Sequence, residues 1–450
     1  MKKLYSIIAC ALLLGVAMYW YFHRDSDRAR DVLPADAVAV AVFQPSELAK
    51  NLGLEPNDIK RISSTFEDLN DAFDLTKPIY VFTTETGLSG FSLNVKDADK
   101  VAESLDFFGY KDEEQGDLHW IVNDGDGIGL YDKEKMLVCK VGNAQEESAI
   151  RSKVETLMQQ KRQKLEAFGN INKQDGELKF TAPLKLILED RGFKGQGEKT
   201  KELEDAVLNT AFKVENHALS LTAKLDTPTD LELPLAPIKG NLGDMEPADA
   251  CFRLCVNMNG EQLLPYLREV PQLRSALLAM NMSIDADMMI KAIDGDVSLS
   301  IPRFDLKDPD FVFIATLANT DFLTYADEWG GVTRRGASDF ATSDGNICFG
   351  VRDGKLYICS KREIGKLEKK GQGESSKSWE AKGKYLSASI DIAKIVKAYP
   401  AAMVILVTVP AARELLDGIE QVTVSADTKQ SLELRIETKE DVKELISKVL

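Results

Sequence analysis

Cysteine and histidine have the richest chemistry in this 450-residue sequence, because thiolates and imidazoles act as nucleophiles, bases and metal ligands. Cys251 and Cys255 lie four residues apart on one face of an expected strand, about 13 Å along it, so they cannot bridge each other. No histidine has a second histidine or a cysteine at ligand spacing, so we expect neither a zinc site nor a catalytic histidine. The six cysteines and three histidines are Cys10, Cys139, Cys251, Cys255, Cys348, Cys359, His23, His119 and His217.

One pair of cysteines could form a disulfide bond. If Asp353 and Gly354 form a two-residue turn, Cys348 faces Cys359 on the paired strand. An internal repeat, described below, aligns Cys348 with Ile128. A branched aliphatic residue at the matching position is what we expect if the thiol is a small apolar core residue. We therefore interpret the thiols as core residues and leave the disulfide open.

Three short motifs resemble functional sites but lack a required part. In "TGLSGFS", Phe91 stands where a nucleophile elbow around Ser89 needs glycine, so we expect a tight loop between strands. "NDGDGIG" and "IDGDVSL" resemble calcium loops without the closing glutamate; calcium at Asp124 and Asp126 is an alternative to an Asp-Gly turn. The sequence has no phosphate-binding loop and no dinucleotide fingerprint. We expect no catalytic, cofactor-binding or metal-binding residue and no cofactor.

The elements that position these residues recur along the chain. Pro-Ala-Asp-Ala occurs at Pro34 and again at Pro247, 213 residues later, each time before a run that alternates like a strand. A strand followed by a helix recurs from Val95 and from Leu317, with an offset of 222. A hairpin at 124–139 aligns without a gap to 344–359, with an offset of 220. Three landmarks in one order at nearly constant spacing indicate an internal duplication.

Each copy of the repeat reads mainly as β-meander with a few helices. We expect an α+β fold of two tandem halves, each an antiparallel meander with helices packed on one face. The expected N-caps of three helices are Asp97, Asn319 and Thr438. After the hairpin we expect one helix over 145–168, ended by Gly169, whereas 362–384 reads as a loop. The apolar run 401–409 is too short to span a bilayer and reads as buried core.

The first residues predict a membrane anchor. Leu4 to Phe22 is a run of nineteen residues without a formal charge, about 28 Å long as a helix, and it ends in bulky aromatic rings. A cleaved signal peptide and lipidation at Cys10 remain alternatives, although Cys10 lies inside the apolar run instead of closing it. The expected division is an anchor at 1–30, a first half at 31–242 and a second half at 243–450.

The charge of the chain excludes one class of partner. The net charge is −16, and residues 1–30 carry five Lys or Arg and two Asp, so residues 31–450 carry −19. Such a surface repels nucleic acid, so no nucleic-acid partner is expected. The region 145–168 is locally basic and would suit a protein partner, an anionic lipid surface or simply solvent. Its basic residues are Arg151, Lys153, Lys161, Arg162 and Lys164.

Two stretches, "VLPADAVAVAVFQPSELAKNLGL" and "KPIYVFTTETGLSGFSLNVKDADKVAESL", resemble an uncharacterised family of Bacteroides-type membrane-anchored envelope proteins. The resemblance implies a signal or anchor followed by a strand entry of the Pro-Ala-Asp-Ala kind, and it supplies no catalytic residues. We expect a single-pass membrane protein, tethered through residues 4–22, whose bulk is periplasmic. Its expected role is non-enzymatic binding of a protein partner or ligand. The alternatives are a hydrolase with a dispersed site and a carrier that holds an apolar ligand between sheet and helices.

Overall fold

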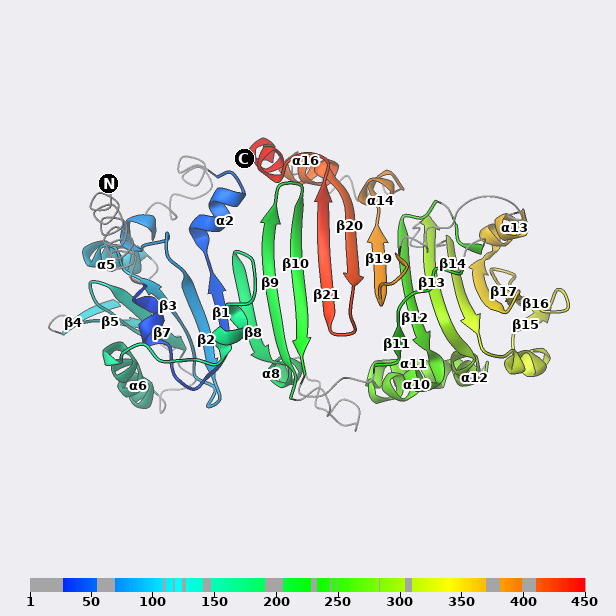
Figure 1. Ribbon diagram of the computed structural model, residues 1–450, viewed down its shortest axis with the longest axis horizontal. Helices are drawn as coiled ribbons and strands as arrows, with labels where there is room; N and C mark the ends of the chain where they lie inside the picture. Colours follow the sequence, from blue (N-terminus) through cyan, green and yellow to red (C-terminus); the bar gives the residue numbers. More distant parts are fainter. Residues whose placement is uncertain are drawn as a thin grey trace, which may run out of the picture. The chain divides into compact units, whose positions relative to one another are not determined.

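The computed structural model shows an α+β protein with extensive antiparallel sheet (Figure 1). The predicted fold class is confirmed at this level. The residues described are 27–449, except for 55–68, 108–110, 116–117, 124–126, 141–146, 191–204, 228–232, 243–244, 248, 283, 304–309, 370–380 and 399–409. No helix among the described residues is long and apolar enough to cross a membrane, and the expected anchor at 4–22 lies outside them.

The chain divides into two compact units. Unit 1 comprises residues 1–48 and 56–169, and unit 2 comprises residues 49–55 and 170–450. The last strands of the expected first half belong to unit 2, because β10 pairs there with β21 at the end of the chain. The expected boundary at residue 242 separates the two copies of the repeat. It is not the boundary between the two compact units.

Unit 1 holds an antiparallel sheet whose described strands pair in the order β1–β2–β3–β7–β6–β5–β4. These strands are β1 (Ala37–Phe43), β2 (Ile79–Thr84), β3 (Ser89–Asn94), β4 (Lys111–Gln115), β5 (Leu118–Asn123), β6 (Gly127–Tyr131) and β7 (Lys135–Lys140). The helices are η1 (Ala29–Val32), α5 (Ala98–Phe107) and α6 (Glu147–Gln159), with α2 (Pro45–Asn51) and α7 (Ala167–Ile171) at the limits of the unit.

Unit 2 holds a longer antiparallel sheet, whose order is β15–β16–β17–β18–β14–β13–β12–β19–β20–β21–β10–β9–β8, with short β11 beside β12. The strands are β8 (Leu178–Pro183), β9 (Val207–Glu215), β10 (Ala218–Asp226), β11 (Leu235–Ala236), β12 (Phe252–Asn259), β13 (Ile293–Arg303), β14 (Asp310–Leu317), β15 (Val332–Arg334), β16 (Asp339–Thr342), β17 (Ile347–Arg352), β18 (Lys355–Ser360), β19 (Leu386–Ile390), β20 (Ile419–Ala426) and β21 (Ser431–Thr438).

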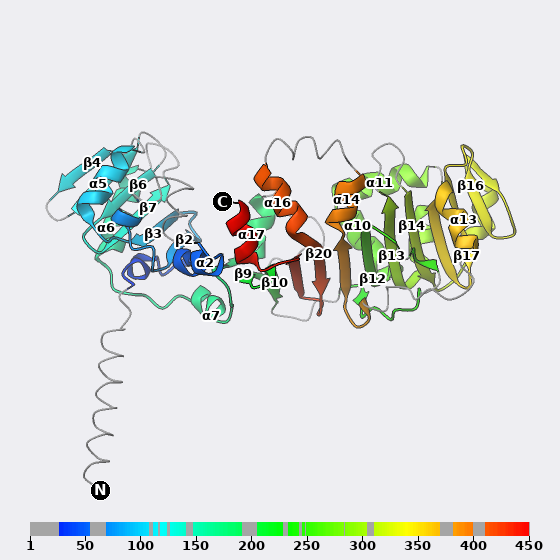
Figure 2. The ribbon, with the colours of Figure 1, turned by 90° about the horizontal axis from the view of Figure 1, so that it is seen from above.

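The helices of unit 2 follow its strands at intervals along the chain, and α17 comes after the last strand. Figure 2 shows α14, α16 and α17 on the same side of the part of the sheet that contains β20, and both α14 and α16 contact β20. The helices are α8 (Leu184–Asp190), α10 (Gly260–Glu269), α11 (Pro271–Asn281), α12 (Ala286–Lys291), η3 (Asp321–Glu328), α13 (Lys361–Lys369), α14 (Ile392–Ala398), α16 (Pro410–Gly418) and α17 (Val442–Val449).

The order of strand pairing is the same in the two expected halves. β1–β2–β3–β7–β6–β5–β4 corresponds to β12–β13–β14–β18–β17–β16–β15, and β8–β9–β10 corresponds to β19–β20–β21. The registers also agree with the offsets found in the sequence. One cross-strand row in unit 1 is Val42–Tyr80–Ser92–Leu137, and the matching row in unit 2 is Cys255–Ser298–Ile314–Tyr357.

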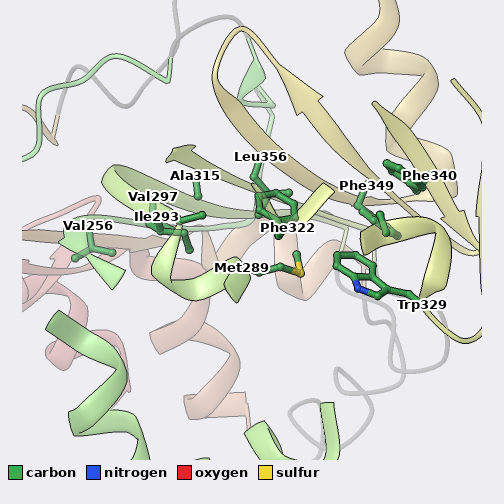
Figure 3. Packing of buried hydrophobic residues seen from close by; sticks show 12 residues of the cluster. Val256, Met289, Ile293, Val297, Ala315, Phe322, Trp329, Phe340, Phe349 and Leu356 are labelled. Carbon is green, nitrogen blue, oxygen red and sulfur yellow. The ribbon is translucent and has the colours of Figure 1, made fainter. Parts of the chain in front are cut away.

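Matching positions also contribute to matching cores. In unit 2, Phe322, Trp329, Phe349 and Phe340 form a row of stacked rings with centroids 5.4–6.4 Å apart (Figure 3). The buried residues Ala315, Phe340 and Leu356 of this cluster correspond to Leu93, Ile121 and Met136 of the unit 1 core. The same alternation of apolar side chains therefore buries the same face of both meanders.

The regions after the two hairpins differ from the sequence-based predictions. The helix expected over 145–168 ends at Gln159, because the Gln160 side chain bonds the backbone oxygens of Asp31 and Leu33 and holds the chain out of helical continuation. The loop expected at 362–384 begins instead as helix α13, whose Ile364 packs on a buried cluster. Both hairpins therefore lead into a helix. The apolar run 401–409 lies outside the described residues.

The expected helix caps are correct in the first case and wrong in the last. Asp97 accepts bonds from the backbone N–H groups of Asp99 and Lys100 at the start of α5. At η3 the N-cap position is Thr320 and not the expected Asn319, although Asn319 accepts a bond from the backbone N–H group of Asp321. α17 is capped by Asp441 and not by Thr438, because the chain makes an additional turn before Val442.

Candidate functional site

The strands β9, β10 and β21 of unit 2 carry polar side chains on one face and apolar side chains on the other. Successive side chains of a strand point to opposite faces, so Thr222 of β10 shares its face with Ala211 of β9 and Glu433 of β21, which lie directly opposite it. Its neighbour Leu221 points to the other face, opposite Phe212. The two faces offer different chemistry, and the candidate site lies on the polar one.

A hollow of about 530 Å³ opens on this polar face. Ser220, Thr222 and Lys224 line its floor, and residues 170–175 at the end of α7 and the turn at 427–431 contribute to its wall. We call it the polar hollow. Its other lining residues are mostly amides, hydroxyls and charged groups, and none of the described lining residues is aromatic. The polar hollow therefore offers hydrogen bonds and charge, without a ring on which a ligand could stack.

Two of the three lysines that line the polar hollow are paired with carboxylates. The Lys213 Nζ atom lies 2.5 Å from Asp175 Oδ2, a contact that raises the pKa of Lys213 and lowers the pKa of Asp175. Lys224 pairs with Asp226 at 2.9 Å. Five carboxylates and three lysines line the polar hollow, so its net charge is −2 and it favours neutral or cationic ligands over anionic ones.

Beside these pairs, Arg435 of β21 bonds Glu215 of β9 at 2.8 Å and lies 3.7 Å from Glu433. The bond to Glu215 raises the pKa of Arg435. Glu215, Glu433 and Arg435 therefore form an ion-pair cluster at one end of the polar hollow, and these charges are already in place before a ligand binds.

An amide network fixes the other end of the polar hollow. The Asn209 amide donates to Asp226 Oδ2 at 2.9 Å, while its oxygen accepts from the Thr181 hydroxyl at 2.8 Å and from the Gln174 amide at 3.3 Å. Asn209 and Thr181 are buried. Because both side-chain atoms of Asn209 are engaged, the orientation of this amide is fixed and the lining is preorganised.

The thiols lie in the core of the protein. All five cysteines beyond Cys10 are buried thiols outside any disulfide bond, and Cys348 faces Cys359 as the predicted turn register requires. Burial raises the pKa of Cys139 to about 12, and burial together with Glu246 and Asp296 does the same for Cys255. Such thiols stay protonated at neutral pH and are poor nucleophiles.

Among the described histidines, His119 contacts both a carboxylate and an aromatic ring. Its Nδ1 atom lies 3.1 Å from Asp112 Oδ2, and its ring stacks on Tyr131 with centroids 4.7 Å apart. Burial, followed by Asp112, raises the pKa of Tyr131 above its ordinary value. This group lies on β4, β5 and β6, and His119 itself is on β5, which pairs with a strand on each side.

The motifs that resembled sites form ordinary structure where they are described. Ser89 begins β3 after a tight loop with Gly87 at φ +83°, and its hydroxyl lies 3.0 Å from that of Thr83. The expected turn at Asp294 and Gly295 is wrong, because both lie inside β13 at an irregularity of its register. Asp124 and Asp126 lie outside the described residues, and no group of metal-ligand type occurs in the part of the chain that the structure describes.

The basic residues expected on one helix fall into two groups. Arg151 of α6 pairs with Glu147 and stacks over the Trp120 ring at 4.9 Å. Lys153 is also on α6, whereas Lys161, Arg162 and Lys164 lie beyond its end, in the irregular segment that leads to α7. The structure therefore does not bring the five residues together on one helix face.

The polar hollow is not among the sites predicted from the sequence. A signal for it exists in the alternation of two kinds of side chain, as in Asn209, Ala211, Lys213 and Glu215 against Leu208, Phe212 and Val214. This alternation indicates two different faces. It does not indicate that β10 pairs with β21, about 210 residues away, and that pairing is what assembles the site.

Comparison with known proteins places the chain in one family. Residues 29–440 match the family described as domain of unknown function DUF4836. The protein belongs to this family. The match begins within η1, where the described fold begins. It confirms the expected membership of an uncharacterised family.

Other comparisons find distant similarity at most. No curated protein matches the chain. Among solved structures, crystal form IV of TP0453 has a TM-score of 0.30 at 10% identity, over 43% of this chain and 78% of that one. Crystal form I of TP0453 has a TM-score of 0.22 at 9% identity, over 76% of this chain and 97% of that one. At these scores neither fold nor function is carried over.

Proposed function

We propose that this protein is a membrane-tethered extracytoplasmic envelope protein that binds a partner or ligand without catalysing a reaction. The uncharged run Leu4 to Phe22 supports the tether, and the basic start at Lys2 and Lys3 supports export of the body. The duplicated strand order supports a body that arose by copying one α+β unit.

The observation that carries the binding role is the polar hollow. Its volume suits a small molecule or a short segment of peptide, and two of its three lysines are already paired with carboxylates. A ligand that enters would exchange hydrogen bonds with hydroxyls and amides that are held in place beforehand, which lowers the entropy cost of binding. We propose that the ligand is neutral or cationic and rich in hydrogen-bonding groups. It is either a free small molecule or a segment of a protein partner.

Affinity purification from the native envelope tests this proposal. Thr222→Trp places a large side chain in the polar hollow, while the control Leu221→Trp makes the same change on the opposite face of the same strand. We expect wild type and the Leu221→Trp variant to co-purify the same protein or small molecule by mass spectrometry. The Thr222→Trp variant should lose it. Equal recovery with both variants would show that the polar hollow is not the binding site.

The apolar face of the same strands favours a carrier as the second candidate. Leu178, Phe212, Leu221 and Leu434 form a cross-strand row over β8, β9, β10 and β21, and Leu178 and Leu221 remain 42% and 40% exposed. Partly exposed apolar rows of this kind bind acyl chains or apolar peptide faces. In the experiment above, a lipid lost from the Leu221→Trp variant alone would support the carrier.

A further inference from the structure

The segment that follows the expected anchor is fastened to unit 1 from its first described residue. The buried carboxylate of Asp27 accepts bonds from the Tyr80 hydroxyl and from Asn94 Nδ2, the latter at 2.9 Å. The other amide atom, Asn94 Oδ1, accepts the backbone N–H groups of Arg28 at 2.8 Å and Ala29 at 3.2 Å. The chain therefore has no free linker after Asp27.

A second segment of unit 1 crosses over this one and holds it in place. Gln160 Nε2 donates to the backbone oxygens of Asp31 at 3.2 Å and Leu33 at 2.8 Å. Arg162 donates from Nη2 to the backbone oxygen of Asp27 at 2.6 Å and from Nε to Asp31 Oδ1 at 2.8 Å. Residues 160–164 thus lie beside the point at which the described chain begins.

The distance from this point to the apolar run is short. Only the four residues His23 to Ser26 separate Phe22 from Asp27. Even fully extended, the five peptide units between Phe22 and Asp27 span about 17 Å. The headgroup layer of a bilayer is itself about 6 Å deep on each side. If residues 4–22 lie in a membrane, the surface of unit 1 around Asp27 must therefore lie at or near the headgroups.

Basic side chains outnumber carboxylates on that surface, where Asp27, Asp31 and Glu134 also lie, although the protein as a whole is acidic. Lys161 and Lys164 are exposed, and within the described residues neither has an ion-pair partner. The Arg30 guanidinium lies 4.2 Å from the centre of the Phe168 ring. Arg28 pairs with Asp31 and Glu134. We call the basic residues of this surface the exit patch, and its members are Arg28, Arg30, Lys161, Arg162 and Lys164.

We propose that the exit patch lies on anionic lipid headgroups and so fixes which surface of unit 1 faces the bilayer. The proposal rests on the tether of the proposed function. Residues 31–450 carry −19, so an anionic bilayer repels most of the chain and attracts this patch. Since the fastened segment leaves little slack, attraction at the exit patch and repulsion elsewhere favour one orientation of unit 1 relative to the membrane.

Hydrogen exchange of the full chain in nanodiscs tests the proposal. Two lipid compositions are compared, phosphatidylcholine alone and an equal mixture of phosphatidylcholine and phosphatidylglycerol. We expect the backbone amides of 160–166 to exchange about fivefold more slowly, or slower still, in the anionic nanodiscs, and the difference to vanish at high salt. The double variant Lys161→Glu/Lys164→Glu should lose this slowing. The control Lys100→Glu/Lys111→Glu makes the same charge change on α5 and β4 and should retain it.

The possible outcomes distinguish a failure of the exit-patch proposal from a failure of the proposed tether. Equal exchange in both lipids, with the protein still retained in the nanodisc after an alkaline wash, overturns the exit patch and leaves the tether standing. Release of the protein by the alkaline wash overturns the tether, and the exit patch with it. Protection in native envelope membranes but not in the anionic nanodiscs points to a protein partner and also overturns the lipid proposal.

Discussion

Asp296 shows how one carboxylate can hold the segment between the two halves of the chain. Its side chain is fully buried and accepts the backbone N–H groups of Lys239, Gly240 and Asn241 at 2.9, 2.7 and 3.2 Å, and the Asn257 amide at 2.7 Å. A buried carboxylate is tolerated when several N–H groups satisfy it, and these bonds are stronger than bonds between neutral groups. Asp296 therefore anchors the chain just before the second Pro-Ala-Asp-Ala.

We predict that Asp296→Ala lowers the free energy of unfolding by about 3 kcal/mol, because it leaves buried N–H groups without acceptors. Urea unfolding followed by circular dichroism measures the change. Asp294→Ala is the control two residues away. Asp294 is exposed, its side chain bonds Asn259 at 3.3 Å within the described part of the chain, and its loss should change stability by less than about 0.5 kcal/mol. Equal effects of both substitutions would contradict the role assigned to Asp296.

We predict that the buried thiol of Cys255 makes the protein less stable at alkaline pH. The pKa of Cys255 is raised from 9.0 to about 12, so the folded form keeps its proton where the unfolded form has lost it. Its contribution is complete below pH 9.0 and is lost as pH rises through about 12. Cys255→Val, which copies Val42 of the first half, should make the unfolding midpoint fall less steeply between these pH values. An unchanged slope would contradict the assignment.

At the scale of elements, packing between helices determines which glycines can be replaced. Gly260 begins α10, and a Cβ atom there would lie 1.8 Å from the backbone oxygen of Ile290 in α12. A Cβ atom at Gly330, after η3, would meet nothing within 4 Å. The close approach of α10 and α12 therefore depends on the missing side chain at Gly260.

We predict that Gly260→Ala destabilises the protein by about 3 kcal/mol, because α10 must move away from α12. Gly330→Ala is the matched control and should lie within about 0.5 kcal/mol of wild type. Thermal unfolding measures both. If the Gly260→Ala variant unfolds at the wild-type temperature, the packing of α10 on α12 is not as described.

Local signals predicted the elements better than their ends. The alternation after Pro34 and Pro247, the cap at Asp97 and the hairpin turn at Asp353 all depend on neighbouring residues, and the structure agrees with them. The end of α6 could not be predicted from its own sequence, since it depends on bonds from Gln160 to a segment about 130 residues earlier. The polar hollow could not be predicted from local sequence either, because the pairing of β10 with the distant strand β21 forms it.

At the scale of the whole molecule, the strands of the two expected halves pair in the same order. The turn register places Cys348 opposite Cys359 in β17 and β18, and the matching register places Ile128 opposite Cys139 in β6 and β7. All four residues are buried in their respective cores. Positions that correspond in sequence therefore correspond in space, although one copy has a thiol where the other has isoleucine.

Oxidative cross-linking of an Ile128→Cys variant tests this claim most directly. We predict that refolding of the reduced, denatured chain with a mild oxidant present forms a bond between Cys139 and the cysteine introduced at position 128, and another between Cys348 and Cys359, because both pairs are direct cross-strand neighbours. Leu130→Cys, which faces Leu137 instead, is the control and should form no bond to Cys139. Mass spectrometry of the digested protein identifies each bond. A bond from position 130 to Cys139, or a Cys348–Cys359 bond without its counterpart from position 128, would contradict the shared register.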